Sequence, residues 1–206
     1  MLDKHIIPIV RPLLGLISTF LSAKGITANH MTIAGYCIGL LALPFLAFEQ
    51  YSWALVAILI NRLFDGFDGA IARINGTTDA GGFLDITLDF AFYATVPFGF
   101  VLASPNENGI AGAWLLLSFF TTGSSFLAFA SFAEKRKIED IIYQNKSLYY
   151  MTGLVEGSET IFFFILCCLL PEYFSYIAYF FGSLCLLTAI YRIFFGFRVL
   201  NSIDEF

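Results

Sequence analysis

The chain has 206 residues, of which 58% are hydrophobic and 13% are charged, and it carries 25 phenylalanines and a formal net charge of -5 at pH 7. This composition excludes an ordinary soluble protein and predicts an integral membrane protein. We expect one domain that spans residues 1–206.

Residues 1–25 show the pattern of an amphipathic helix that lies in the membrane interface. Apolar side chains recur there at helical spacing, and polar side chains occupy the opposite side. The apolar set is Ile6, Ile7, Val10, Leu13, Leu14, Ile17 and Leu21, and the polar set is Lys4, Arg11, Ser18 and Ser22. We therefore expect this helix to lie flat on the bilayer surface before the first membrane span.

Residues 30–198 contain six apolar segments. Crossing the hydrocarbon core takes about 20 apolar residues in a helix, and each segment approaches or exceeds that length. The segments are residues 30–48, 52–74, 82–104, 110–133, 152–171 and 174–198. The expected fold is therefore all-α, a polytopic membrane protein with six transmembrane helices.

The positions of the basic residues predict the orientation of these helices. With six spans and the amino terminus inside, all eleven lysines and arginines fall on or near the cytoplasmic side, as the positive-inside tendency requires. The opposite loops carry acids, at Glu49, Glu107 and Glu172. We therefore expect a multi-pass protein of the inner, cytoplasmic membrane, with both termini and the active site on the cytoplasmic side. The bilayer separates the basic residues on one face from the acidic loops on the other, so the net charge of the whole chain says little about its partners. We expect no nucleic acid partner.

We expect the cysteines and two of the glycines inside the apolar segments to have packing roles. The four cysteines, Cys37, Cys167, Cys168 and Cys185, show no metal-ligand spacing with histidine, so we expect them to pack in the interior. Gly35 and Gly39 form a small-xxx-small pair that permits close contact between helices of the bundle.

Four aspartates interrupt the apolar pattern. Asp65 and Asp68 are three residues apart, and Asp85 and Asp89 are four apart, so each pair projects from one side of its own helix. The short connection NGTTDAGG joins the two helices and allows the pairs to face each other. Intramembrane carboxylates are costly and indicate function by default. The spacing thus predicts a cage of four carboxylates, with Asp79 as a turn or capping residue outside it.

Carboxylates at this spacing indicate a metal site. Like charges repel unless cations neutralise them, and oxygen ligands without histidine or cysteine suit Mg²⁺ or Mn²⁺. Four acids suffice to bridge two ions about 4 Å apart, an arrangement that clamps a phosphoryl group. Arg73, one turn after Gly69, adds donors for phosphate oxygens, and Gly66 and Gly69 allow a ligand or a helix to approach closely. The alternative, pairing of the acids with Arg62 and Arg73 alone, leaves two of four charges unbalanced.

These residues resemble the signature of the CDP-alcohol phosphatidyltransferases, D-x-x-D-G-x-x-A-R followed by G-x-x-x-D-x-x-x-D. The run from Asp65 to Arg73 reads DGFDGAIAR, and Gly81, Asp85 and Asp89 follow it, with a spacer one residue shorter than usual. The resemblance implies metal-dependent transfer of a substituted phosphate from a CDP-linked donor, usually CDP-diacylglycerol, to an alcohol with release of CMP.

The resemblance also implies roles for single residues. Asp65, Asp68, Asp85 and Asp89 would ligate two Mg²⁺ or Mn²⁺ ions, and Asp89 would also be the general base on the acceptor hydroxyl. The CDP site would be lined by Gly69, Ala72 and Arg73. Asn29 and Thr32, in the stretch GITANHMTIAGY, would donate toward the nucleotide or, alternatively, cap the first span. The family further implies a homodimer.

The alcohol acceptor is less well specified. An acceptor that carries its own phosphate, such as glycerol 3-phosphate or an inositol phosphate, needs a second basic pocket. Lys135 and Arg192 resemble positions that hold the acceptor phosphate in relatives. Alternatively, EKRK at residues 134–137 is a membrane anchor, and Glu156 or Glu159 is an ion-pair partner of Arg192.

Two other functions remain as alternatives. An intramembrane prenyltransferase also uses paired aspartates with Mg²⁺, but its motifs lie on well-separated helices. A cation transporter should show helix breaks or related halves near the membrane midplane, and this chain shows no second copy of its acidic motif.

Overall fold

The computed structural model describes residues 14–135 and 157–204, and the regular elements in those two ranges are all helices. This confirms the all-α prediction. The order is an amino-terminal helix (Leu14–Ala23), α2 (Ala28–Leu40), α3 (Ala42–Ala47), α4 (Tyr51–Asn75), α5 (Asp79–Ala103), α6 (Pro105–Lys135), α8 (Gly157–Leu169), the short 3₁₀ helix η2 (Pro171–Tyr173) and α9 (Phe174–Asp204).

Each of the six predicted segments contains a helix. Four helical stretches are long and apolar enough to cross a membrane: Ala28–Ala47, which joins α2 and α3, then α5, α6, and Pro171–Ser202. α4 is long, but Arg62, Asp65, Asp68 and Arg73 lower its apolar character. The described part of α8 has 13 residues. Six spans therefore stay a prediction, as does the single domain over the whole chain.

Side-chain caps fix where two helices of the site begin. Thr27 caps α2: its hydroxyl accepts the His30 N–H at 3.4 Å, and its own N–H donates to His30 Nδ1 at 3.3 Å. The alternative that Asn29 or Thr32 caps this helix is therefore wrong, because both lie inside it. Thr78 caps α5 by accepting the Gly81 N–H at 3.1 Å.

The connection between α4 and α5 differs from the prediction at its end. α4 stops before Gly76, whose φ of +94° is a conformation that glycine adopts at low cost. Asp79 was predicted as a turn or capping residue, but it is the first residue of α5. An acid in the first turn is favourable beside the exposed N–H groups of a helix, so the motif GTTD begins the helix three residues before the predicted span.

Two glycines bring α2 against α4 and α5. A Cβ atom added at Gly35 would lie 2.7 Å from the Cβ of Phe64 on α4, and one at Gly39 would lie 2.8 Å from the ring of Phe92 on α5. Real Cβ atoms do not approach so closely, so both positions require glycine. The predicted close packing through this pair is confirmed.

The amino-terminal helix packs on α2 and α4, with one correction to its predicted faces. Leu14 and Leu21 pack against a cluster that contains Met31, Phe67 and Ile71. Ser18 was predicted on the polar side but is fully buried, and Ile17 of the predicted apolar side is 39% exposed. Leu14, Ser18 and Leu21 share one helical face by their spacing. Contact with α4, where Gly66 leaves room for Leu14, thus decides which face is buried.

Aromatic side chains fill the core between α5, α8 and α9. The largest fully buried side chains include Phe92, Phe100, Phe164, Phe174 and Phe181. Phe100 stacks on Phe174 with ring centroids 4.4 Å apart. Cys167, Cys168 and Cys185 are buried there as predicted, whereas Cys37 on α2 is exposed and does not pack in the interior.

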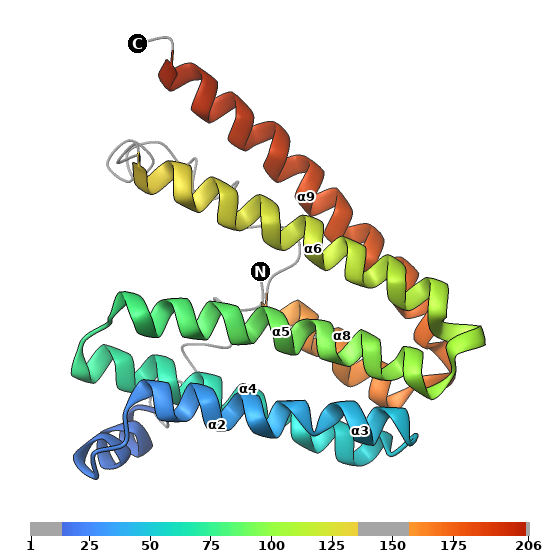
Figure 1. Cartoon of the computed structure of the whole chain (residues 1–206), viewed down its shortest axis with the longest axis horizontal. Coiled ribbons are helices and arrows are strands. Elements are labelled where there is room, and N and C mark those ends of the chain that lie inside the picture. Colours follow the sequence, from blue (N-terminus) through green and yellow to red (C-terminus); the bar gives the residue numbers. More distant parts are fainter. Residues whose placement is uncertain (1–13, 136–156, 205–206) are drawn as a thin grey trace.

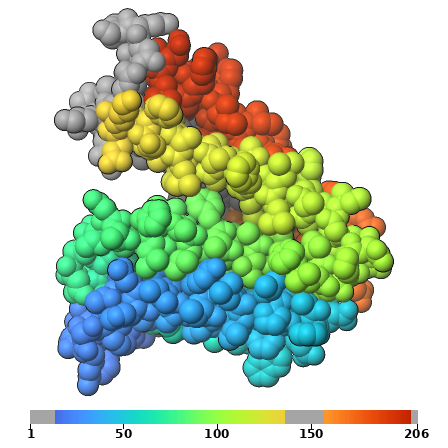
Figure 2. Space-filling model, in the orientation of Figure 1, coloured from blue at the N-terminus to red at the C-terminus, as the bar shows by residue number. Residues whose placement is uncertain are grey.

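The helices form two groups that separate at one end of the molecule. α2 packs against both α4 and α5, and α6 and α9 lie side by side (Figure 1). α6 contacts α5 but slopes away from it toward the carboxyl end of α6. In the space-filling view the surface is hollowed between the first half of α5, in green, and the end of α6, in yellow (Figure 2). The aspartates of α5 lie in this first half.

Candidate active site

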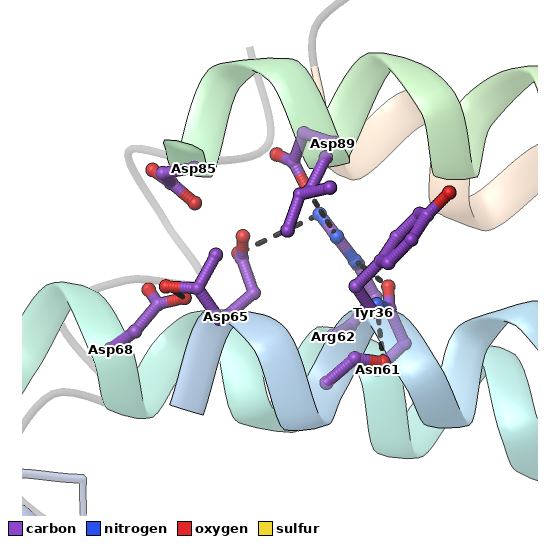
Figure 3. A pocket seen from close by; sticks show the side chains of 10 residues that line it. Tyr36, Asn61, Arg62, Asp65, Asp68, Asp85 and Asp89 are labelled. Atoms are coloured by element: carbon purple, nitrogen blue, oxygen red, sulfur yellow. Dashed lines mark hydrogen bonds and ion pairs between the residues drawn. The ribbon is translucent and has the colours of Figure 1, made fainter. Parts of the chain in front are cut away.

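Three aspartates from two helices meet in the bundle. Asp65 and Asp68 project from α4 toward Asp85 on α5 (Figure 3), and one oxygen of each lies within 4.8 Å of the others. Asp68 is 5% exposed, and the other two are partly buried. Three carboxylates at this separation repel one another unless a cation balances them. Their hard oxygen atoms and converging geometry fit a divalent ion such as Mg²⁺ or Mn²⁺.

The fourth aspartate of the predicted cage, Asp89, is paired with a side chain of α4. Arg62 Nη2 donates to Asp89 Oδ1 at 2.6 Å, and Arg62 Nη1 lies 3.6 Å from Asp65 Oδ2. Asp89 lines the same pocket as the other three acids. The structure therefore brings all four predicted acids to one pocket, with three close together and the fourth attached to an arginine.

Arg62 is fixed from several sides. Its Nε donates to Asn61 Oδ1 at 2.9 Å, and its Nη1 donates to the Tyr93 hydroxyl at 3.3 Å. The guanidinium carbon lies 5.2 Å from the ring centroid of Phe92 and 5.4 Å from that of Tyr93, within cation–π range. Asn61 in turn donates through Nδ2 to the carbonyl of Gly35 at 3.0 Å. This network ties α2, α4 and α5 together behind the acids.

Asn61 and Tyr36 also line the pocket, and neither they nor a positioning role of Arg62 were expected from the sequence. A signal was present, because a basic residue three positions before Asp65 in an apolar helix needs a partner. The identity of that partner depends on how α4 and α5 pack, which no spacing along α4 reveals.

Thr32 contacts the acids directly. It is buried on α2, and its hydroxyl donates to Asp68 Oδ2 at 2.8 Å. Asn29, one turn earlier, is exposed and lies beside the start of α5, because a Cβ at Gly81 would come within 3.1 Å of Asn29 Oδ1. The structure thus places Thr32 at the acids and Asn29 at the adjoining surface.

The predicted CDP-binding residues continue α4 beyond Asp68. Gly69 and Ala72 are partly buried, and Arg73 is exposed in the last turn. The atom nearest to a Cβ added at Gly69 is Arg73 Nη1, at 3.5 Å. The guanidinium therefore lies over Gly69, which leaves a surface of backbone and donor groups next to the acids.

The two predicted acceptor residues lie on the other helix group. Lys135 is exposed at the last residue of α6. Arg192 is 6% exposed on α9, where Nη1 donates to the Thr122 carbonyl of α6 at 3.0 Å, and its guanidinium lies 5.4 Å from the ring centroid of Phe126. Of its predicted acidic partners, Glu159 lies in the first turn of α8, and Glu156 falls outside the described residues.

Comparisons with known proteins agree with this arrangement. The sequence model of the family "CDP-alcohol phosphatidyltransferase" matches residues 25–191. The chain is 54% identical over 205 residues, all of both proteins, to the "Inner membrane protein YnjF" of Escherichia coli K12. It is 38% identical over 96 residues to the "Archaetidylinositol phosphate synthase" of Pyrococcus horikoshii, which is 46% of this chain and 51% of that protein.

Solved structures share the fold. The phosphatidylinositol phosphate synthase PgsA1 of Mycobacterium tuberculosis with CDP-DAG bound superposes with a TM-score of 0.67 and 17% identity, over 90% of this chain and 94% of that one. The same enzyme in complex with manganese and citrate gives a TM-score of 0.66 and 18% identity, over 89% of this chain and 88% of that one. At these identities the likeness shows the fold alone, whereas the family match covers the acidic motif itself. The chain belongs to the CDP-alcohol phosphatidyltransferases, a family of membrane-embedded transferases of phospholipid biosynthesis.

Proposed function

We propose that this protein transfers a phosphatidyl group from CDP-diacylglycerol to an alcohol and releases CMP, in a reaction that requires Mg²⁺ or Mn²⁺. The observation that carries the proposal is the meeting of Asp65, Asp68 and Asp85 within 4.8 Å from two helices of a family member. A membrane bundle suits a donor whose acyl chains stay in the bilayer.

Asp65, Asp68 and Asp85 would hold the metal, with Asp89 at the edge of the same site. Two bound divalent ions would neutralise the diphosphate of the donor and the charge that builds on the departing CMP. Thr32 would orient Asp68 through the bond to Oδ2. Gly69, Ala72 and Arg73, with Asn29 across the gap, would line the cytidine diphosphate.

Asp89 would act as the general base. Its carboxylate takes the proton of the acceptor hydroxyl while that oxygen forms a bond to the phosphorus of the phosphatidyl group. The bond between this phosphorus and the bridging oxygen of CMP breaks, and the electron pair leaves with CMP. The 30% exposed side chain of Asp89 suits this role, because the acceptor must reach it from outside the bundle.

The acceptor would carry its own phosphate. The named activities of two similar proteins, an archaetidylinositol phosphate synthase and a phosphatidylinositol phosphate synthase, favour an inositol phosphate over glycerol 3-phosphate. Arg192 bonds to Thr122, and the neighbouring Gly123 approaches the ring of Phe90, which follows Asp89 in α5. Arg192 is therefore bonded to the part of α6 that packs against α5 next to Asp89. Lys135 would add positive charge at the rim.

We further propose that the protein lies in the inner membrane with its active site toward the cytoplasm, and that it forms a homodimer. The first placement is supported by the name of the Escherichia coli relative and by the distribution of basic residues. The dimer is an expectation from the family.

The test is CMP release by the purified protein from CDP-diacylglycerol with Mg²⁺ or Mn²⁺. The acceptor panel would be inositol phosphate, glycerol 3-phosphate, inositol, serine and no acceptor. Release that depends on one alcohol and stops with a chelator supports the proposal. Metal-independent release would contradict the metal site. No release with any acceptor, together with uptake of a labelled cation into proteoliposomes, would favour the transporter alternative.

A further inference from the structure

The four acids of the site do not share one environment. Asp65, Asp68 and Asp85 have oxygens within 4.8 Å of one another, whereas Oδ1 of Asp89 is occupied by Arg62 at 2.6 Å. A charged hydrogen bond of this length is strong and directional. Because Arg62 holds Oδ1, the carboxylate of Asp89 keeps one orientation, and Oδ2 remains available to a substrate.

Arg62 is itself held in place by several contacts, so it can fix the orientation of the Asp89 carboxylate. Its side chain is 16% exposed, bonded to Asn61 and Tyr93, and placed against the rings of Phe92 and Tyr93. Asn61 is anchored on the backbone of α2 at Gly35. The guanidinium is planar, so it can bond to Asp89 through one nitrogen and to Asn61 through another in only one orientation. A lysine has a single nitrogen and could not reproduce this fixed fork of donors.

We propose that Arg62 is a positioning residue of the transfer reaction: it holds Oδ1 of Asp89 so that Oδ2 faces the acceptor hydroxyl. This inference rests on the proposed function and deepens it. Arg62 touches neither substrate in this role, and it acts through Asp89. A base displaced by about 1 Å loses on the order of a hundredfold in rate, which sets the size of the expected effect.

A purely structural ion pair is the competing explanation. It would also join α4 to α5, and its loss would loosen the bundle, lower metal affinity and reduce turnover together. A positioning residue makes a different prediction, because its contact with the three-acid group is a single ion pair with Asp65, at 3.6 Å. Removing the positive charge 3.6 Å from Asp65 should leave Mn²⁺ binding intact or tighter.

The first arm of the experiment needs no turnover. It is an experimental structure of the full chain with Mn²⁺ bound, in which we expect Arg62 Nη2 to stay within hydrogen-bond distance of Asp89 Oδ1. Separation of the two groups in the metal-loaded protein would overturn the proposal, whether or not the protein releases CMP. Absence of CMP release by the wild type would refute the proposed function alone.

The second arm compares variants by kcat, KM for each substrate, Mn²⁺ affinity by titration calorimetry and thermal unfolding. Arg62→Gln should lower kcat about a hundredfold, with donor KM and Mn²⁺ affinity within about threefold of the wild type. Arg62→Lys should recover part of the loss. In an Asp89→Asn background, where turnover is already abolished, Arg62→Gln should leave Mn²⁺ affinity and donor binding unchanged, since the oriented group is already gone. The matched control is Arg198→Gln, an exposed arginine of α9 that should be neutral.

Two kinetic outcomes would overturn the proposal. Turnover by Arg62→Gln close to the wild-type value would show that Asp89 needs no support. A joint fall of kcat, Mn²⁺ affinity and melting temperature would make Arg62 a structural residue. If Arg62→Gln does not fold, Arg62→Lys supplies the comparison of kcat with Mn²⁺ affinity and melting temperature.

Discussion

Replacing Thr32 by valine distinguishes two roles for this residue. The sequence motif places Thr32 at the nucleotide, whereas in the structure its hydroxyl donates to Asp68 Oδ2 at 2.8 Å. Valine has nearly the same shape but no hydroxyl, so Thr32→Val removes the donor without opening a cavity. We expect the main effect on metal affinity, and a smaller effect on the KM for the CDP-linked donor.

The size of the effect follows from the burial of Asp68. Residues that hydrogen-bond to a metal ligand typically contribute about 10- to 100-fold to affinity, because they hold the ligand in one orientation. Asp68 is 5% exposed, so water has little access to replace the lost donor. A net hydrogen bond to a charged group is worth about 1.5–3 kcal/mol, which corresponds to a similar range. We therefore expect Mn²⁺ to bind Thr32→Val tenfold or more weakly.

The assay is Mn²⁺ titration of the purified protein, followed by CMP release as a function of Mn²⁺ concentration. Thr32→Ser keeps the hydroxyl and should restore most of the affinity. The matched control is Thr95→Val on α5, where an equally buried hydroxyl donates only to the Ala91 carbonyl of its own helix, at 2.9 Å. Equal Mn²⁺ affinities of Thr32→Val and the wild type, with a raised donor KM, would refute the orienting role and return Thr32 to the nucleotide.

Three further variants test other parts of the site and the bundle. Asp89→Asn should abolish CMP release while donor binding with Mn²⁺ persists in calorimetry, and full activity would remove Asp89 as the base. Arg192→Ala should raise the acceptor KM far more than the donor KM in steady-state kinetics; an unchanged acceptor KM would indicate an acceptor without a phosphate. Gly39→Leu should lower the free energy of unfolding by about 1–3 kcal/mol through overpacking against Phe92. We expect a lower melting temperature in detergent; a melting temperature equal to that of the wild type would mean that α2 can move away from α5.

The helices and the acidic site could be predicted because their signals are local. Apolar segments of about 20 residues mark membrane helices regardless of how they pack, and each predicted segment contains a helix. Asp65 and Asp68 share a face of α4 by spacing alone, and the short connection to α5 leaves few ways to place Asp85 other than opposite them. The same logic explains the successful prediction for Gly35 and Gly39.

Features that depend on packing could not be predicted in this way. Ser18 is buried because the amino-terminal helix docks on α4, and the polarity of serine gave the opposite expectation. Thr27 and Thr78 are caps because of the backbone conformation at two helix starts, while Asn29 and Asp79 were chemically equivalent candidates. The attachment of Asp89 to Arg62 joins residues 27 positions apart, on different helices.

α4 shows how a site of this kind fits in a membrane bundle. Asn61 and Asp68 are almost fully buried, whereas Leu59, Leu63 and Ile74 of the same helix are about half exposed. The polar side chains of the site therefore face the bundle together with buried apolar ones such as Ile58 and Ile71, while other apolar side chains of α4 face outward, unlike a helix on the surface of a soluble protein. Buried charges persist only where partners or ions compensate them. Arg62 offsets one of the four negative charges through its contacts with Asp89 and Asp65, and divalent cations would balance the charge that remains.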